Sequence, residues 1–240
     1  MYQLLKLSLI IFVTTVNLAN AEDTIIKKYP DGSIYTGPLK KGLHHGVGVY
    51  SLPNGYEYNG EWVEGKIQGK GIANLPDGSI YKGEFSLGKP SGIGKMVFLD
   101  KKIYEGEWKD GSPNGEGSLI LTDGTGYKGE WLSGKRHGHG LSSYSNKSTY
   151  QGMFQSGQRN GFGILNENSG YSYRGDWLNG QPNGQGVEEY VSGAVYIGKF
   201  KDGKRSGTGS MRYPNNEVAI GSWANGKLVS ASKRLIPASN

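Results

Sequence analysis

The residue types that most often carry out catalysis or bind metals are few in this chain. Its 240 residues include 4 His and no Cys. His44 and His45 are adjacent, whereas His137 and His139 lie far along the chain. His137 and His139 share strand parity and could together hold a metal ion, but no carboxylate or thiolate recurs beside them at ligand spacing. We therefore expect no metal site and no cofactor.

Two further patterns resemble motifs of enzymes without their structural context. Ser86 and Lys89 match a Ser-x-x-Lys nucleophile pattern, which needs the start of a helix to aim both side chains. Here the pattern falls in a hairpin turn. The many Gly-x-Gly matches also lack the strand-to-helix context of a phosphate-binding loop. The sequence therefore predicts no catalytic residue.

The most regular chemical feature is a row of aromatic residues. A unit of the form Tyr-x-Gly-x-aromatic-x-x-Gly-x-x-x-Gly-x-Gly recurs every 23 residues without insertion or deletion. Its opening residues are Tyr35, Tyr58, Tyr81, Tyr104, Tyr127, Tyr150, Tyr173 and Tyr196. Such rings are the only candidates for a core, and they also stack on sugars or lie at headgroup depth in membranes. Both interpretations stay open.

If a ligand binds to this aromatic row, the central units are the expected place, because they are held on both sides. The candidate ligand-binding residues are Tyr81, Phe85, Tyr104, Trp108, Tyr127 and Trp131.

Short strands must position these rings. In residues 58–80, the segment 58–62 alternates in the manner of a half-buried strand. A turn at Gly65-Lys66 leads to a second alternating segment, 69–75. The tripeptide 76–78, Pro-Asp-Gly, closes the unit, because Pro fixes φ, Asp caps the turn and Gly takes the positive-φ position. Each unit is therefore two short antiparallel strands.

A fixed short period predicts a repeat architecture, because one such unit cannot bury its apolar face alone. Gly accounts for 41 residues and hydrophobic residues for 35%, which is poor in aliphatic material for a two-layer domain. The recurring glycines leave room for rings to lie flat over neighbouring backbone. We expect an all-β fold, an elongated single-layer antiparallel β-meander or solenoid of 23-residue hairpin repeats.

Basic residues recur in the turn after the aromatic residue of each unit. Stacking of equal phases would set them along one margin, made of Lys66, Lys89, Lys135, Arg136, Arg159, Lys204 and Arg205. This basic margin could attract acidic lipid, polysaccharide or nucleic acid, or it could protect the sheet edge. An acidic row that includes Glu61 and Glu107 runs nearby and the net charge is only +6, so nucleic acid is the least favoured partner.

Residues 1–21 lie outside the period and have the features of a secretory signal peptide. Lys6 is their only charge, an apolar run extends from Leu7 to Val16, and the segment 19–21 fits a cleavage site. The alternative is an uncleaved anchor, but the run is shorter than the roughly 20 residues that span a bilayer. We expect cleavage after Ala21, a mature chain without a transmembrane span, and a location in the periplasm or outside the cell.

The units resemble MORN repeats (membrane occupation and recognition nexus), a family of 23-residue β-hairpin units. The resemblance rests on YNGEWVEGKIQGKG, YEGEWKDGSPNGEG, YKGEWLSGKRHGHG and YRGDWLNGQPNGQG, and it covers residues 31–226. Leu39 replaces the aromatic residue of the first unit and Ala219 replaces Tyr in the ninth, as terminal caps would allow. We divide the chain into a signal peptide (1–21), a lead-in (22–30), an array of eight repeats plus a partial ninth (31–227) and a tail (228–240), which is a final strand or a loose end.

The resemblance implies a protein-interaction scaffold or an appendage of an enzyme domain, and for some arrays a link to phospholipid membranes. No catalytic domain fits beside this array. Our first hypothesis is a non-enzymatic scaffold of the cell envelope or exterior that binds a partner protein along its extended β face. The alternative is a module that binds anionic membrane lipid or cell-envelope glycan, and an enzyme is the third hypothesis.

Overall fold

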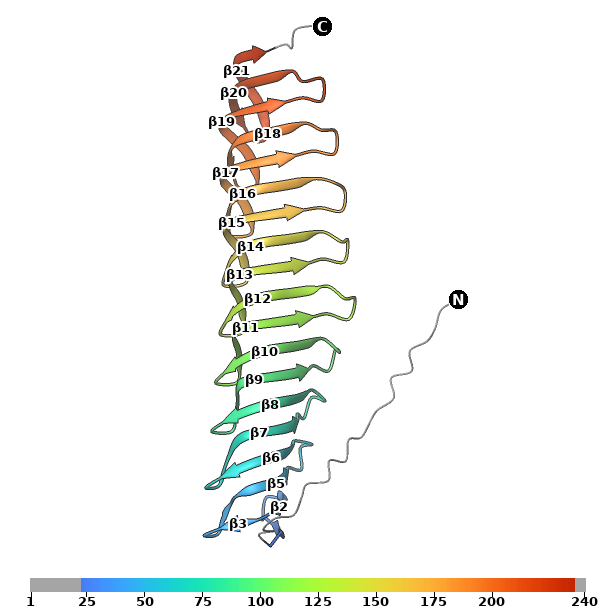
Figure 1. Cartoon of the computed structure of the whole chain (residues 1–240), viewed down its shortest axis with the longest axis vertical. Coiled ribbons are helices and arrows are strands. Elements are labelled where there is room, and N and C mark those ends of the chain that lie inside the picture. Colours follow the sequence, from blue (N-terminus) through green and yellow to red (C-terminus); the bar gives the residue numbers. More distant parts are fainter. Residues whose placement is uncertain (1–22, 236–240) are drawn as a thin grey trace, which may run out of the picture.

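The computed structural model describes residues 23–235, and these form a long, narrow, all-β molecule (Figure 1). One antiparallel sheet of 19 strands runs along the long axis, and in it each strand pairs with the next strand of that sheet in the chain. This is the expected single-layer β-meander, so the prediction of the fold class is confirmed.

In the regular part of the array each repeat contributes a strand of 7 residues and a strand of 9 residues. The first strands are β6 (Glu57–Val63), β8 (Ile80–Ser86), β10 (Ile103–Lys109), β12 (Gly126–Leu132), β14 (Thr149–Gln155), β16 (Ser172–Leu178), β18 (Val195–Lys201) and β20 (Val218–Ala224). The second strands are β7 (Lys66–Asn74), β9 (Lys89–Val97), β11 (Ser112–Ile120), β13 (Lys135–Ser143), β15 (Gln158–Asn166), β17 (Gln181–Glu189), β19 (Lys204–Arg212) and β21 (Lys227–Leu235).

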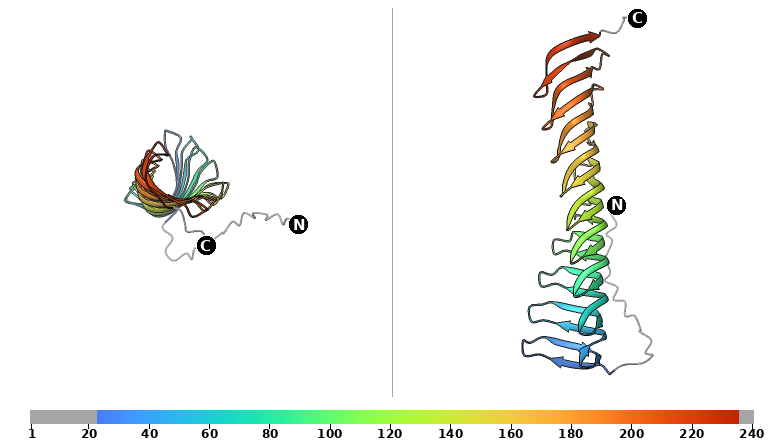
Figure 2. Two further views of the ribbon diagram at one scale, coloured as in Figure 1. Left: turned by 90° about the horizontal axis from the view of Figure 1, so that it is seen from above. Right: turned by 90° about the vertical axis from the view of Figure 1, so that its left-hand side faces the viewer.

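A β-bulge bends every regular hairpin at the same place. In the pair β10–β11, Gly106 faces Gly117 whereas Trp108 faces Pro113, so the second strand carries two extra residues between these pairs. The pairs from β6–β7 to β18–β19 share this irregularity. Bulges bend and twist a strand. Because the bends are in register, the sheet is folded lengthwise into a trough, seen along its axis in Figure 2.

Two-residue turns join the strands within a repeat. The turn between β10 and β11 consists of Asp110 (φ 50°) and Gly111 (φ 84°), and two positive φ values are typical of the type I′ turn that suits the twist of a hairpin. In the second repeat the turn residues are Glu64 and Gly65, one position earlier than the expected Gly65-Lys66. The N–H of Gly111 donates to the carbonyl of Pro90 at 2.9 Å, so each turn is tied to the preceding repeat.

Five-residue turns join one repeat to the next, and they have the expected chemistry. Between β7 and β8 the N–H of Leu75 donates to the carbonyl of Ser79 at 2.8 Å. The Asp77 carboxylate accepts the N–H of Ser79 at 2.9 Å, and Gly78 takes a φ of 84°. The buried Ser79 hydroxyl accepts the N–H of Leu99 in the following turn, so these turns also stack.

The core is an unbroken row of aromatic rings on the concave side, the only side on which a single sheet can enclose side chains. Tyr104 is 1% exposed, and its ring makes edge-to-face contacts with Trp108 and Trp131 at centroid distances of 5.1 and 5.2 Å. Its hydroxyl donates to the carbonyl of Glu107 at 2.9 Å. A Cβ on Gly117 would lie 2.6 Å from the Tyr104 ring, so this glycine makes the room that the sequence predicts.

The two ends of the array depart from the regular pattern. In the first repeat the hairpin is split into β2 (Ile34–Gly37), β3 (Leu39–Lys40), β4 (Leu43–His44) and β5 (Gly46–Ser51), and β3 and β4 form a separate two-stranded sheet. Pro38 interrupts the strand there, since it has no N–H to donate. The lead-in contains a strand, β1 (Ile25–Lys28), which pairs with β2. At the other end, β21 pairs with β20, so the tail begins as a final strand.

Candidate binding groove

The six rings proposed from the sequence as ligand-binding residues lie in the core. Tyr81, Phe85, Tyr104, Trp108, Tyr127 and Trp131 are all at most 8% exposed. They contact one another and the repeats on either side, and the N–H of the Trp131 side chain donates to the carbonyl of Gly117 in the preceding repeat at 3.1 Å. Little ring surface is left for a ligand, and the binding role of these six residues stays a prediction.

A second row of aromatic side chains lines the groove above this core. Tyr144, Tyr171, Tyr190 and Tyr213 are partly buried and pack against the core cluster. They were not predicted from the sequence, because they lie outside the phase of the repeat that the core rings occupy. Tyr144, Tyr190 and Tyr213 are separated by multiples of 23 residues, so the same period read at a second phase would have found them.

The residues of the proposed basic margin differ in exposure. Lys66, Lys89, Lys135 and Lys204 are exposed at the first position of a strand, whereas Arg136, Arg159 and Arg205 follow at the second position or its equivalent and are half-buried. The lysines are thus exposed, whereas the arginines are half-buried against the core, and Lys135 lines the same cavity as Arg136. The single basic margin stays a prediction.

Each of the three arginines lies over rings of the aromatic core. The guanidinium carbon of Arg136 is 5.2 Å from the ring centroid of Phe154, that of Arg159 is 4.8 Å from Trp177, and that of Arg205 is 4.6 Å from Trp223. Cations at these distances are attracted to the faces of aromatic rings. The arginines therefore form the half-exposed upper layer of the groove in the C-terminal part of the array.

The polar contacts of the arginines differ. Arg136 donates to the carbonyl of Gly157 at 2.8 Å and to the hydroxyl of Ser142 at 3.3 Å. Arg159 donates to the hydroxyl of Tyr144 at 2.8 Å. Among residues 23–235, only Arg205 of the three has a carboxylate within 4.0 Å, that of Glu188 at 3.7 Å.

Glu188 anchors a polar cluster in the groove. The residue is 8% exposed, and its carboxylate accepts hydrogen bonds from the hydroxyls of Tyr171 at 2.9 Å and Tyr190 at 2.5 Å. Burial is the main cause that raises the pKa of both phenols, and the nearby Glu188 charge raises it further. Because the carboxylate has two phenol donors and Arg205, its polar groups are satisfied within the fold.

Two cavities open along the groove beside the arginines. One of about 430 Å³ is lined by Leu119, Trp131, Arg136 and Tyr144, among others. Another of about 480 Å³ is lined by Tyr190, Arg205, Tyr213 and Trp223, among others. Both combine apolar walls with a guanidinium, an arrangement typical of sites that orient a largely apolar ligand by a few polar contacts.

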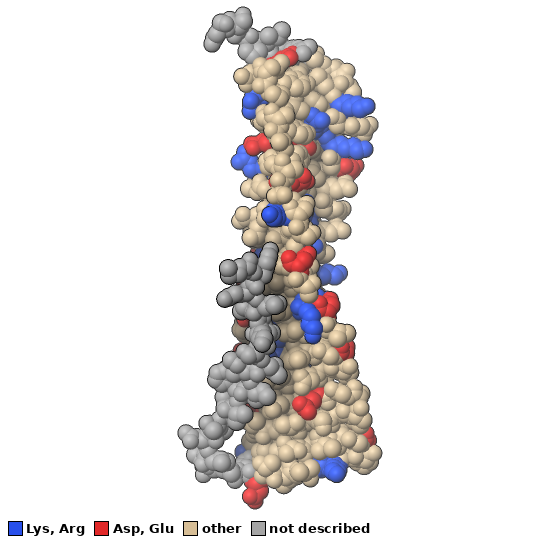
Figure 3. All heavy atoms as spheres, turned by 90° about the vertical axis from the view of Figure 1, so that its right-hand side faces the viewer, with Lys and Arg blue, Asp and Glu red and all other residues tan. Residues whose placement is uncertain are grey.

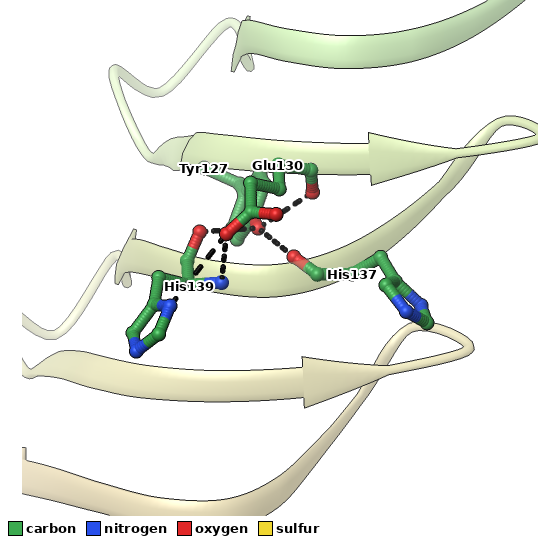
Figure 4. A network of polar contacts seen from close by, with 4 residues as sticks. All are labelled: Tyr127, Glu130, His137 and His139. Atoms are coloured by element: carbon green, nitrogen blue, oxygen red, sulfur yellow. Dashed lines mark hydrogen bonds and ion pairs between the residues drawn. The ribbon is translucent and has the colours of Figure 1, made fainter.

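The acidic row has a structural role in the bulges. The Glu130 carboxylate accepts the backbone N–H of His139 at 2.7 Å, and the hydroxyl of Tyr127 donates to the Glu130 carbonyl at 2.9 Å (Figure 4). Equivalent bonds join Glu107 to Glu116 at 2.9 Å. These carboxylates therefore satisfy backbone donors that the bulge removes from the strand ladder.

The bulge also separates the two histidines that the sequence places on one face. Gly138 takes a φ of 51°, and the imidazoles of His137 and His139 point away from each other (Figure 4). The expectation of shared parity is therefore wrong. In the described part of the chain no group of three or more His, Cys, Asp or Glu side chains is placed to hold a metal ion.

The structure also shows where the Ser-x-x-Lys pattern of the sequence lies. Ser86 ends β8 and Lys89 begins β9, and the two are partners across a hairpin turn, as expected.

Acidic and basic side chains are interspersed along the face shown in Figure 3. Within residues 23–235 there is no helix long and apolar enough to cross a membrane. The proposed signal peptide and its cleavage site lie outside the described residues.

The period also matches a known family. The family model described as MORN repeat matches residues 35–55, 58–80, 81–101, 104–126, 127–149, 150–165, 173–195 and 196–218. None of the curated proteins matches the sequence of this chain.

Several solved structures are similar in fold at low identity. The TCP10 domain of Danio rerio CPAP is 14% identical over 87% of this chain and 99% of that chain, with a TM-score of 0.46. The same domain in complex with a peptide of Danio rerio STIL is 14% identical over 88% of this chain and 99% of that chain, with a TM-score of 0.38. The SAS-4 (dCPAP) TCP domain of Drosophila melanogaster, in complex with a proline-rich motif of Ana2, is 11% identical over 83% of this chain and 90% of that chain, with a TM-score of 0.36.

Proposed function

We propose, since this chain belongs to the MORN repeat family, that it is a non-enzymatic scaffold that binds a partner protein along its extended β surface. A repeat array of this kind is a binding surface whose size grows with the number of units, and its function depends on the side chains it presents.

The groove is the observation that supports this function best. Its floor is a rigid aromatic core, whereas its upper layer is a half-exposed set that includes Tyr144, Tyr213, Arg136 and Arg159. Tyr and Arg are enriched in protein interfaces, where they supply large contact areas and directed hydrogen bonds. We place the partner in the groove, over the C-terminal half of the array.

A photo-crosslinking experiment tests this function. Benzoylphenylalanine at position 213 would lie in the groove, and the same residue in place of the exposed Gln151 serves as the control. We expect irradiation in the native host to yield a protein adduct of one defined mass from position 213 and none from position 151. Equal adducts from both positions, or none from either, would contradict a partner held in the groove.

A second candidate function is attachment to anionic lipid or acidic glycan. The exposed lysines Lys66, Lys89, Lys135 and Lys204 favour it, because exposed charges beside the turns can reach a flat surface. Replacement of all four by Glu should abolish sedimentation with phosphatidylserine vesicles at low salt, whereas the parent chain should sediment. If the parent and the variant sediment equally, the lysines serve only solubility.

We propose that the chain is located in the periplasm or outside the cell, because residues 1–21 have the features of a secretory signal peptide. Mass spectrometry of the chain from its native host should then find Glu22 at the N-terminus. Full-length protein in the cytosol would contradict the proposed location but would not contradict the scaffold function.

A further inference from the structure

We propose that Arg136 and Arg159 recognise an acidic segment of the partner in the polyproline II conformation, with carboxylate side chains at positions i and i+3. This inference rests on the proposed function and names the chemistry of the partner. The segment would run along the groove, across the strands, with one carboxylate on each guanidinium.

The two guanidiniums are available for such a ligand. Each arginine carries five N–H donors, of which Arg136 uses two and Arg159 uses one within residues 23–235. Neither has a carboxylate within 4.0 Å in that part of the chain. The rings beneath hold both planes in place, which leaves the fork of N–H groups pre-organised for bidentate contact with an anion.

The spacing of the two arginines selects the conformation of the ligand. They occupy the same position of neighbouring repeats, which are two strands, or about 9.6 Å, apart. A polyproline II helix has three residues per turn and rises about 9.3 Å per turn, so positions i and i+3 face the same way at nearly this distance. A β-strand alternates faces, so its residues i and i+3 would point to opposite sides.

The neighbouring side chains fit an extended apolar segment between the carboxylates. Tyr144 lies between the two arginines and bonds to Arg159, and the cavity of about 430 Å³ beside Arg136 has Leu119 and Trp131 in its lining. Polyproline II segments dock onto such aromatic-lined grooves because they lose little conformational entropy on binding. The cavity has room for one large apolar side chain next to the first carboxylate.

Two carboxylates near the groove, both in the described part of the chain, already have partners. Asp123, on the turn that borders the cavity, already accepts the N–H of Thr125 at 2.9 Å and its hydroxyl at 2.6 Å. Glu188 is engaged by two phenols and Arg205. The row of equivalent arginines without a carboxylate partner therefore consists of Arg136 and Arg159. The next repeat has Pro182 at the equivalent position, and Arg205 in the repeat after it is paired with Glu188.

The recessed position of these arginines favours a peptide over a membrane surface. Arg136 and Arg159 are half-buried against the aromatic core, which lies within the trough that the sheet forms. A flat bilayer meets the rims of a trough, and only a narrow ligand enters it to reach the layer of arginines above the core. The guanidiniums are therefore accessible to a single extended chain.

Fluorescence anisotropy with two labelled probe peptides tests the proposal. One probe consists of Glu-Pro-Pro triplets, and the other has the same composition with its Glu residues in one block. We expect saturable binding of the triplet probe and weaker binding of the block probe. Arg136→Gln and Arg159→Gln should each lower the affinity for the triplet probe about tenfold, as expected for loss of one charged hydrogen-bonded contact.

The controls separate this site from general electrostatics and from unfolding. Lys89→Gln removes the same charge from an exposed position outside the cavity and should leave the affinity for the triplet probe within about twofold. Arg159→Lys keeps the charge but loses the fork, so it should bind more weakly than the parent. Circular dichroism melting of each variant establishes that it is folded, and equal affinity of the two probes, or of the parent and the arginine variants, would overturn the proposal.

A phage-displayed library of random peptides distinguishes failure of this proposal from failure of the proposed function. Enrichment of peptides with carboxylates three residues apart, lost with the double Arg136→Gln, Arg159→Gln variant, supports the proposal. Enriched peptides without this pattern that bind both proteins equally would overturn it and leave the scaffold intact. If the library yields no binder and position 213 yields no crosslink, both fail. Sedimentation of phosphatidylserine vesicles that depends on Arg136 and Arg159 would point to a lipid instead.

Discussion

At the scale of single residues, Leu87 has a backbone conformation that its side chain disfavours. It is the first residue of a type I′ turn with a φ of 51°, a position that Asp110, Asn179 and Asp202 occupy in other repeats. Left-handed backbone costs a residue with a Cβ about 1–2 kcal/mol, and Asn less than most. The side chain of Leu87 is mainly exposed, so packing does not offset this cost.

We therefore predict that Leu87→Asn stabilises the chain by about 0.5–1 kcal/mol, because it relieves the strain without loss of core contacts. Chemical denaturation followed by circular dichroism measures the change. Asn179→Leu is the matched control and should destabilise by a similar amount. A decrease in stability for Leu87→Asn would show that the leucine contributes packing that its exposure does not reveal.

His44 makes the N-terminal end of the array sensitive to pH. Its ring stacks on Tyr35 at a centroid distance of 3.7 Å and accepts or donates a hydrogen bond of 2.6 Å with Tyr29. Burial, with a smaller contribution from the charge of Lys27, lowers the pKa of His44 below its ordinary value of 6.5. The unfolded chain therefore binds this proton more tightly than the folded chain does.

The sign of the pH effect follows from this lowered pKa. The stabilisation by neutral His44 is complete above 6.5, the unfolded value, and is lost as the pH falls through that value and the lower folded one. We expect the midpoint of urea denaturation, monitored by Trp fluorescence, to decrease across this interval, and less so in His44→Phe. Equal decreases in both proteins would assign the effect to other groups.

At the scale of the structural element, a carboxylate in the bulge stabilises the hairpin. Glu107 accepts the N–H of Glu116 at 2.9 Å across the bulge, yet Met153 and Lys199 occupy the equivalent position in other repeats. The bulge therefore forms without the carboxylate, and the carboxylate contributes to its stability. In the sequence these acids indicate only an exposed row, since the bulge that uses them is not visible there.

We predict that Glu107→Ala lowers the stability by about 1 kcal/mol, the typical net value for a hydrogen bond, because the exposure of Glu107 screens the extra contribution of its charge. Glu107→Gln keeps an acceptor oxygen and should retain most of that stability. Glu105→Ala, which removes only an exposed ion pair with Lys95 at 3.1 Å, should change the stability by less than about 0.5 kcal/mol. Denaturation midpoints compare the three, and equal losses for Glu105 and Glu107 would contradict the role in the bulge.

Features of the hairpin that depend on one strand or one turn could be predicted from the sequence, whereas features that depend on the pairing of two strands could not. The alternation of Tyr58 and Trp62, the Asp77-Gly78 turn and the glycines under the rings each follow from one strand or turn, so they were predictable. The bulge could not be predicted, because its two extra residues become apparent only when the residues of the two paired strands are aligned. That miss pairs His137 with His139, whose imidazoles the bulge turns apart, so the site was predicted less well than the fold.

At the scale of the whole molecule, equal phases make the repeats interchangeable. Each repeat contacts its neighbours through strand pairing, edge-to-face rings and the bond from its turn to the preceding repeat. Stability in such arrays is a sum over units and their interfaces. The length of the chain is therefore adjustable in steps of one repeat.

We predict that deletion of residues 104–126 leaves a shorter folded protein, because residue 103 then meets Tyr127 at the phase at which it now meets Tyr104. Deletion of residues 104–115 is the control, since it breaks the register of strands and rings. Circular dichroism and size-exclusion chromatography should show a folded, shortened molecule only in the first case. Equal loss of folded signal in both would contradict the independence of the repeats.

The direction of the strands has a mechanical consequence. Because the strands lie across the long axis and β1 and β21 lie at opposite ends, a pull on the two ends acts along the hydrogen bonds between strands (Figure 1). Such a load falls on one pair of strands at a time, so it peels the sheet open instead of shearing all its bonds together. Under tension the array would therefore unfold and lengthen one hairpin at a time. Each hairpin could pair again with its neighbour when the tension falls.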